Sequence, residues 1–325
     1  MISFYMATLG KGLPRQLIRS LQPHARCSRM SSSVATAFSP KAVPKNPLIS
    51  ESTDFEEIQE KRPNFDHFKK IEVTKSPNPT WKYGQGVKGR DGRGEHREVD
   101  PYSEERPMIN NYRLLIAGIA PRPVGFISTV SGDGKTQNLS PFSYFQLIDH
   151  DPPMFVVGFS PRSGREKDTY RNLKETGECV INTVSEDMIE AVNASSIDAP
   201  YGVSEWEISG LTQAHTTTVK APRVQESVLS IEGKVVDIKE FKPHSEGKSI
   251  GGIVLIKASR FWVREDATNV DASDINLEVL RPVGQLGGMS YGRIVSTFEV
   301  PRKTWEKEYA KSELLTKLEE SKPQV

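Results

Sequence analysis

The sequence predicts a mainly β fold that closes, or nearly closes, into a barrel. From Arg122 to Asp266, short apolar runs rich in β-branched residues follow one another, and only two helical patterns interrupt them. Turn-forming Gly and Asp residues separate several of these runs. Strands with few intervening helices are typical of barrels, whereas a doubly wound sheet needs a helix after almost every strand. We therefore expect a barrel.

The first expected strand is RPVGFISTV at 122–130, and SGDGK at 131–135 predicts a hairpin turn after it. A helix is expected over REKDTYRNLKETGE, where Gly177 is placed to end it. A second helix is expected over SEDMIEAVNASS, with Ser185 as its N-cap. The remaining expected strands are MFVVGFS (154–160), CVINTV (179–184), LSIEGKVVDIKEF (229–241) and GGIVLIKASRFWVRED (251–266).

The chain ends differ in composition from this central part. The first acidic residue is Glu51, and seven Lys and Arg residues precede it. An acid-free, Arg- and Ser-rich start is typical of a mitochondrial presequence, and a disordered basic tail explains it equally well. We expect a basic leader at 1–35, a poorly structured tail and extended arm at 36–110, a barrel at 111–298, and a C-terminal helix and tail at 299–325.

Several classes of function lack support in the sequence. The net charge of +1 gives no electrostatic argument for nucleic acid or a membrane surface, and no apolar stretch approaches the length of a membrane span. The six histidines show no ligand spacing, so we expect no metal site. GQGVKG at 84–89 matches G-x-G-x-x-G, but neither a strand before it nor a helix after it is expected, so it is not a dinucleotide site.

Two segments combine residues that suit a phosphorylated flavin. NLSPFS offers small polar groups for the edge of a flat ring, and Pro141 is expected to break the strand ladder and free backbone groups nearby. SGREKDT brings basic residues and a hydroxyl to the start of the expected helix, which is a favourable anion site. The residues concerned are Asn138, Ser140 and Ser143 in the first segment, and Arg162, Arg165, Lys167 and Thr169 in the second.

The order of these motifs resembles the flavin reductase-like, FMN-binding split-barrel family, from about Asn111 to Val295. The resemblance implies a six-stranded Greek-key barrel with helical additions, a homodimer, and FMN near the subunit interface. By position, it implies that Ser128 and Thr129 line the ring and ribityl chain. It further implies isoalloxazine contacts from Asn138, Leu139, Ser140 and Ser143, phosphate contacts from Arg165, Lys167 and Thr169 with Arg162 close by, and a place near the pocket for Asn193.

The function implied by the resemblance is an FMN-dependent oxidoreductase that passes hydride between NADH or NADPH and flavin. Hydride transfer depends on stacking and closeness more than on acid–base groups, so no catalytic residue is assigned. A non-catalytic flavin-binding or electron-carrier protein stays open, because no nicotinamide-binding motif is legible. The location stays open between mitochondrion and cytoplasm.

Overall fold

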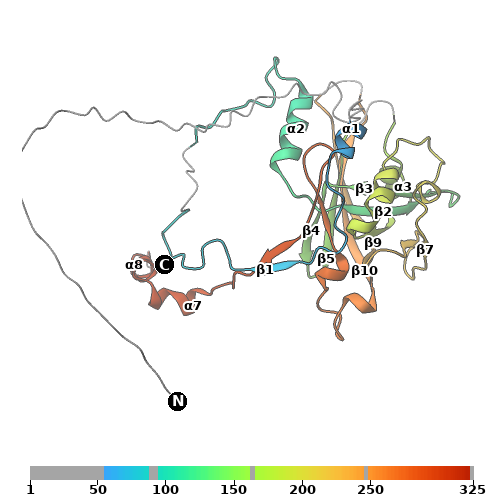
Figure 1. Ribbon diagram of the computed structural model, residues 1–325. Coiled ribbons are helices and arrows are strands. Elements are labelled where there is room, and N and C mark those ends of the chain that lie inside the picture. Colours follow the sequence, from blue (N-terminus) through green and yellow to red (C-terminus); the bar gives the residue numbers. More distant parts are fainter. Residues whose placement is uncertain (1–54, 88–93, 162–164, 245–247, 323–325) are drawn as a thin grey trace, which may run out of the picture. The chain divides into compact units, whose positions relative to one another are not determined.

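The computed structural model describes residues 55–87, 94–161, 165–244 and 248–322 (Figure 1). The expected leader at 1–35 and the candidate phosphate ligand Arg162 lie outside these residues. In the described part, no helix is both long and apolar enough to cross a membrane.

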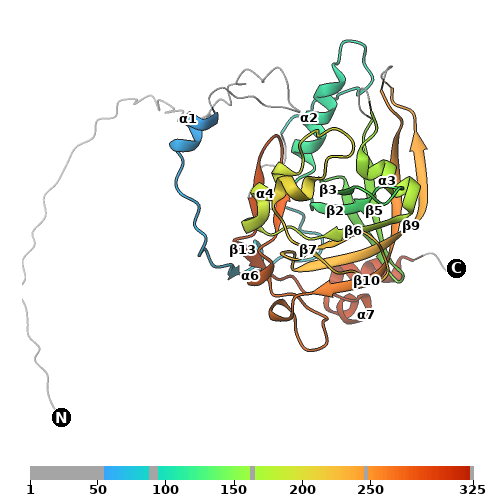
Figure 2. The ribbon, with the colours of Figure 1, turned by 90° about the vertical axis from the view of Figure 1, so that its right-hand side faces the viewer.

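One seven-stranded antiparallel sheet dominates the described residues (Figures 1 and 2). It confirms the mainly β prediction, although the strand number is seven rather than the six that the resemblance implied. In spatial order the strands are β3 (Gln137–Phe142), β2 (Gly125–Val130), β6 (Glu178–Asn182), β9 (Leu229–Phe241), β10 (Gly251–Val263), β5 (Pro153–Phe159) and β4 (Phe145–His150).

The sheet curls because its two edge strands are neighbours in the chain. β3 and β4 lie at opposite ends of the strand order, yet only Ser143 and Tyr144 separate them. A connection this short requires the two edges of the sheet to approach each other. The expected hairpin at 131–135 is also present, because the Ser131 N–H donates to the Thr136 carbonyl between β2 and β3.

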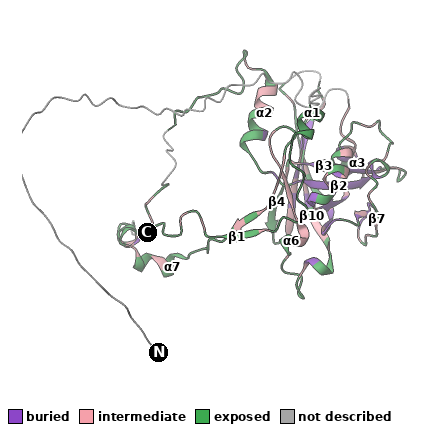
Figure 3. Ribbon diagram, viewed as in Figure 1, coloured by how far each residue is buried: buried purple, intermediate pink, exposed green. Residues whose placement is uncertain are grey.

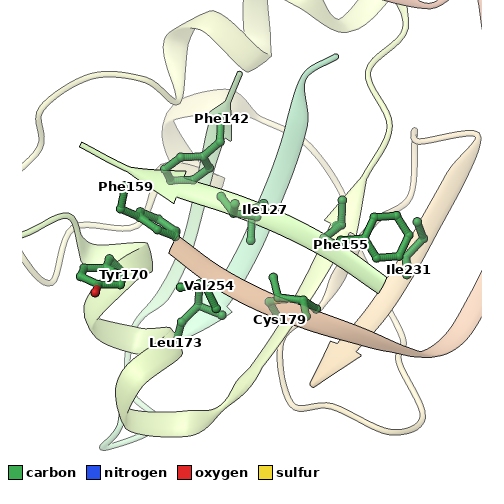
Figure 4. Packing of buried hydrophobic residues seen from close by; sticks show 12 residues of the cluster. Ile127, Phe142, Phe155, Phe159, Tyr170, Leu173, Cys179, Ile231 and Val254 are labelled. Atoms are coloured by element: carbon green, nitrogen blue, oxygen red, sulfur yellow. The ribbon is translucent and has the colours of Figure 1, made fainter. Parts of the chain in front are cut away.

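Many residues on the strands of the sheet are buried (Figure 3), and apolar side chains pack together there (Figure 4). Phe142, Phe159 and Tyr170 form a run of packed rings, with centroid distances of 4.9 and 4.8 Å. Tyr170 and Leu173 come from the helix after β5 and pack on strands of the sheet. Their burial fixes that helix against the barrel wall, and its first turn thereby acquires a fixed position next to β3.

The helical predictions hold in part. The first expected helix is shorter, and Gly177 ends it with a φ of 67°. The second begins as a short 3-10 turn, and the Ser185 side chain gives no capping hydrogen bond. The helices are α1 (Phe55–Glu60), α2 (Met108–Gly118), α3 (Asp168–Thr176), α4 (Ile189–Ala194), α5 (Glu205–Ser209), α6 (Leu277–Leu280), α7 (Trp305–Glu308) and α8 (Glu313–Glu320), with 3-10 turns η1 (Glu186–Met188), η2 (Glu265–Ala267) and η3 (Tyr309–Lys311).

Segments from both ends of the described chain pair with each other. Three further strand pairs are β1 (Glu72–Thr74) with β13 (Ser296–Phe298), β11 (Val283–Gln285) with β12 (Tyr291–Arg293), and β7 (Gln213–Ala214) with β8 (Arg223–Val224). The β1–β13 pair is parallel and joins the arm to a strand far along the chain. The expected C-terminal helix is present as α7, η3 and α8, so the pattern at 304–320 is helical but interrupted.

A cluster of charged side chains around the buried Glu186 holds the arm beside β12. The Glu186 carboxylate accepts from Arg281 Nε at 2.5 Å and from Arg293 Nη2 at 2.8 Å. The same two guanidinium groups also donate to arm carbonyls, those of Lys69 at 3.1 Å and Asp66 at 2.8 Å. We call Glu186, Arg281 and Arg293 the arm clamp.

Candidate functional site

A small polar cavity of about 60 Å³ lies between the outer edge of β3 and the first turn of α3. Five of the expected ligand residues line it together: Asn138, Ser140, Arg165, Lys167 and Thr169. The sequence placed these residues about thirty positions apart, and the burial of α3 on the sheet brings them to one place. We call this the β3–α3 cavity.

The β3 strand differs from expectation at its proline. Pro141 does not break the ladder, because it stays in register opposite Phe126, and Phe142 after it pairs with Gly125. The reason is the strand's position: β3 is an edge strand, and a proline is tolerated where its missing N–H faces away from the neighbouring strand. The outer edge of β3, not a break in it, faces the cavity.

Hydrogen bonds between buried side chains hold β3 and β2 to α3. Asn138 Nδ2 donates to Thr169 Oγ1 at 2.8 Å, and Asn172 Nδ2 donates to Thr129 Oγ1 at 3.0 Å. All four residues are almost fully buried, with exposed fractions between 0% and 3%. Asn138 and Thr169 therefore meet the cavity with their positions already fixed by each other.

The two cations of the cavity are already in contact with other groups. Arg165 Nη1 donates to Asp168 Oδ1 at 2.6 Å and Nη2 to Asp198 Oδ1 at 3.2 Å, and Nη2 also donates to the carbonyl of Ala199. Lys167 Nζ lies 5.5 Å from the centre of the Phe142 ring. Lys167 is also the N-cap residue of α3, and no side chain caps that helix.

Sequence reasoning missed one side of the cavity. The loop after α4 contributes Ser196, Ile197, Asp198 and Ala199, and the first residue of α5 contributes Glu205. Glu205 is 5% exposed, and its Oε2 accepts from the Leu139 N–H at 3.1 Å. Burial raises the pKa of this carboxyl and the Leu139 N–H opposes the rise, while the charge of Asp168 adds to it and that of Arg165 opposes it. Nothing in the pattern GVSEWE distinguishes this acid from a helix-capping one.

The other expected site residues do not line the β3–α3 cavity. Ser128 is fully buried and donates to the Pro222 carbonyl at 2.5 Å, and the Leu139 side chain belongs to the apolar core. Ser143 Oγ accepts from Arg122 Nε at 3.3 Å. Asn193 is exposed on α4 and lies outside the cavity lining. The assignment of Ser128, Leu139 and Ser143 to the flavin, and of Asn193 to the neighbourhood of its pocket, remains a prediction.

The cavity suits the phosphate of a flavin mononucleotide. Two cations, a buried amide and a buried hydroxyl face the same small volume, and the first turn of α3 adds N–H groups that no side chain caps. Three carboxylates, Asp168, Asp198 and Glu205, also line it, so the donor set is not purely cationic. Among the described residues, no group of three His, Cys, Asp or Glu side chains is arranged to hold a metal ion.

Comparison with known proteins covers the same part of the chain. Residues 117–272 match the model of the flavin reductase like domain. An uncharacterised protein from Halalkalibacterium halodurans is 37% identical over 196 residues, which are 60% of this chain and 91% of that protein. The family match at 117–272 includes β3, α3 and the cavity between them.

Solved structures share the fold. Nitrilotriacetate monooxygenase component B from Bacillus cereus superposes with a TM-score of 0.59 at 28% identity, covering 64% of this chain and all of that one. A protein from Shewanella frigidimarina assigned as a flavin reductase with a split barrel domain gives a TM-score of 0.54 at 21% identity, covering 65% of this chain and all of that one. The sheet, the cavity and these matches agree: the chain belongs to the flavin reductase-like family and has its split-barrel fold.

Proposed function

We propose that this protein is an FMN-dependent oxidoreductase that transfers hydride between NADH or NADPH and flavin. One observation carries the proposal: in a flavin reductase-like chain, the residues expected for a phosphate line one cavity at the start of α3. The cavity's volume of about 60 Å³ suits a terminal phosphate rather than a ring. This favours FMN, whose phosphate is terminal.

The chain's own residues would hold the cofactor in two ways. Arg165, Lys167 and Thr169 would donate to the phosphate, and Asn138, fixed by its bond to Thr169, would orient the adjoining chain. Ser140 lies on the same stretch of β3 and would extend these contacts toward the ring. When bound, the flavin supplies the hydride-accepting and hydride-donating chemistry, and the protein supplies position and shielding.

The test is spectroscopic. Purified protein is mixed with FMN, and bound flavin is measured by its visible absorption after removal of free cofactor. Anaerobic stopped-flow mixing with NADH and with NADPH then measures bleaching of that absorption. We expect binding, and bleaching with at least one nicotinamide. A chain that stays colourless after incubation with excess FMN contradicts the proposal.

The second candidate is a flavin-binding protein that carries electrons without oxidising a nicotinamide. Its support is the absence of any legible nicotinamide-binding motif in the sequence. The same stopped-flow experiment separates the two functions. Flavin that binds tightly, stays oxidised with both nicotinamides and is reduced by dithionite would identify the carrier.

We also propose a homodimer, as the resemblance implies. β4 is an edge strand of the main sheet, and its Leu147 and Ile148 are about half exposed, at 51% and 50%. Exposed apolar side chains beside an unpaired strand edge favour association with another chain. Light scattering coupled to gel filtration measures the mass, and a monomer at micromolar concentration contradicts this part of the proposal.

For residues 1–35 we propose a targeting role in mitochondria, with a cytoplasmic protein as the alternative. The support is the basic, acid-free composition that precedes Glu51. Fusion of residues 1–35 to a fluorescent reporter tests it, and a diffuse cytoplasmic reporter supports the alternative.

A further inference from the structure

The β3–α3 cavity contains an acid where a phosphate site needs donors. Glu205 lines the cavity together with Arg165 and Lys167 and is 5% exposed. An ionised carboxylate and a phosphate repel each other, and burial strengthens that repulsion. Glu205 lies outside the motifs NLSPFS and KDT, so its presence in the cavity requires an explanation.

Two hydrogen bonds to β3 fix the position of Glu205. Ser204 Oγ donates to the Gln137 carbonyl at 2.6 Å, and the Leu139 N–H donates to Glu205 Oε2 at 3.1 Å. These two bonds join the start of α5 to the outer edge of β3. One carboxyl oxygen is thereby held by the Leu139 N–H. If the side chain left the cavity, this N–H would lose its acceptor.

The charges around Glu205 compensate it only weakly. The charge of Arg165 lowers the pKa of Glu205, but Arg165 forms its ion pairs with Asp168 and Asp198, and none joins Glu205 to a described cation. β3, which packs on α5, carries no charged residue. On α4 and α5 the other charged side chains, Glu190 and Glu207, are exposed to solvent. Of the three acids lining the cavity, Glu205 is therefore the one for which ionisation is least compensated.

A phosphomonoester brings between one and two negative charges near neutral pH. The lining already holds three carboxylates against two cations among the described residues. A proton on Glu205 relieves this excess and converts the acid into an O–H donor directed at the phosphate. Burial, which raises the pKa of Glu205, acts in the same direction.

We propose that Glu205 is a phosphate ligand in its protonated form, so that binding of the flavin phosphate takes up one proton per site. This inference rests on the proposed function. It identifies a specificity-determining residue that the motifs NLSPFS and KDT do not contain. It also makes cofactor affinity depend on pH in a defined direction. As the pH rises, Glu205 loses the proton that phosphate binding requires, so the affinity falls.

The experiment is isothermal titration calorimetry of the full chain with FMN, in buffers of different ionisation enthalpy. For the wild type we expect uptake of close to one proton, and a Kd that rises about tenfold per pH unit between about pH 7 and pH 9. Riboflavin lacks the phosphate and is expected to bind without proton uptake. This wild-type measurement requires no substitution in the cavity.

The matched variants are Glu205→Gln and Glu207→Gln on the same helix. Glutamine at 205 keeps an acceptor for Leu139 and offers a permanent donor, so we expect a Kd nearly independent of pH and no proton uptake. Glu207→Gln should behave as the wild type. FMN binding by the wild type without proton uptake, or unchanged uptake in Glu205→Gln, overturns the inference alone. No FMN binding at all overturns the proposed function with it.

Discussion

Glu205 and Glu232 are both buried carboxylates without a cationic partner among the described residues, and their surroundings differ in the number of donors. Glu232 accepts from the N–H groups of Thr217 and Thr218 at 2.8 and 2.6 Å and from Trp262 Nε1 at 2.6 Å. Glu205 accepts from one backbone N–H of another residue.

The titration of the two acids follows this difference. Burial works to raise the pKa of Glu232, but the hydrogen bonds from Thr218, Thr217 and Trp262 outweigh it and lower that pKa to about 2. At Glu205 burial prevails, and the pKa is raised. A buried acid surrounded by donors fixes structure in its ionised form, whereas one that faces an open cavity with few donors is free to exchange a proton with a ligand.

The largest effect is expected from removing the two cations that line the cavity with Glu205. Arg165→Ala combined with Lys167→Ala should weaken FMN binding by about 4 kcal/mol, roughly a thousandfold in Kd, because charge-assisted contacts to phosphate are lost. Flavin fluorescence quenching measures the Kd. Lys174→Ala, which removes one positive charge from α3 outside the cavity lining, should leave it unchanged. Wild-type affinity in the double variant would move the phosphate site elsewhere.

A third buried acid, Glu186, sharpens the comparison because cations rather than neutral donors satisfy it. Glu186→Ala should lower the free energy of unfolding by about 2–3 kcal/mol, since the partly buried guanidinium groups of Arg281 and Arg293 lose their shared acceptor. Chemical denaturation measures this change. The FMN Kd should stay at the wild-type value, and a variant with normal stability but weak FMN binding contradicts a purely structural arm clamp.

Titration of Glu232 should make the free energy of unfolding depend on pH in the acid range. Its folded pKa of about 2 lies below the ordinary glutamate pKa of 4.5, so its stabilisation is present above pH 4.5 and is lost as the pH falls toward 2. The difference corresponds to about 3 kcal/mol at neutral pH. Glu232→Gln should lose this stability at neutral pH and show a flatter acid limb in denaturation curves. An acid limb identical to that of the wild type would refute the assignment.

The smallest expected effect concerns the competition for Arg165. Asp198→Asn removes one of the carboxylates that this guanidinium contacts, while the carbonyl of Ala199 remains as an acceptor. Because exposed ion pairs are weak, we expect FMN to bind only about threefold tighter. The Kd is measured as for the double variant, with Glu190→Gln as an exposed control on α4. Weaker binding in Asp198→Asn would show that Asp198 supports the site instead of competing with it.

Much of the fold was predictable because its causes are local. The β-branched runs at 122–130 and 179–184 became β2 and β6. Gly177 ends α3 because the helix end needs a left-handed backbone conformation, which glycine adopts without strain. The wrong prediction for Pro141 shows what local sequence cannot determine. Pro141 lies in an intact ladder, and whether a proline breaks a strand depends on which neighbours the strand has, which local sequence does not contain.

The sequence by itself determined the strand-rich fold and the residues NLSPFS and KDT, because hydrophobic periodicity and motif order are written along the chain. Tertiary structure decided which of those residues meet. It buried Ser128 in the core, joined Asn138 to Thr169, and brought Asp198 from a loop and Glu205 from the start of α5 to the cavity. The physical reason is that a cavity's charge balance is a sum over residues distant in sequence, and only packing selects the members of that sum.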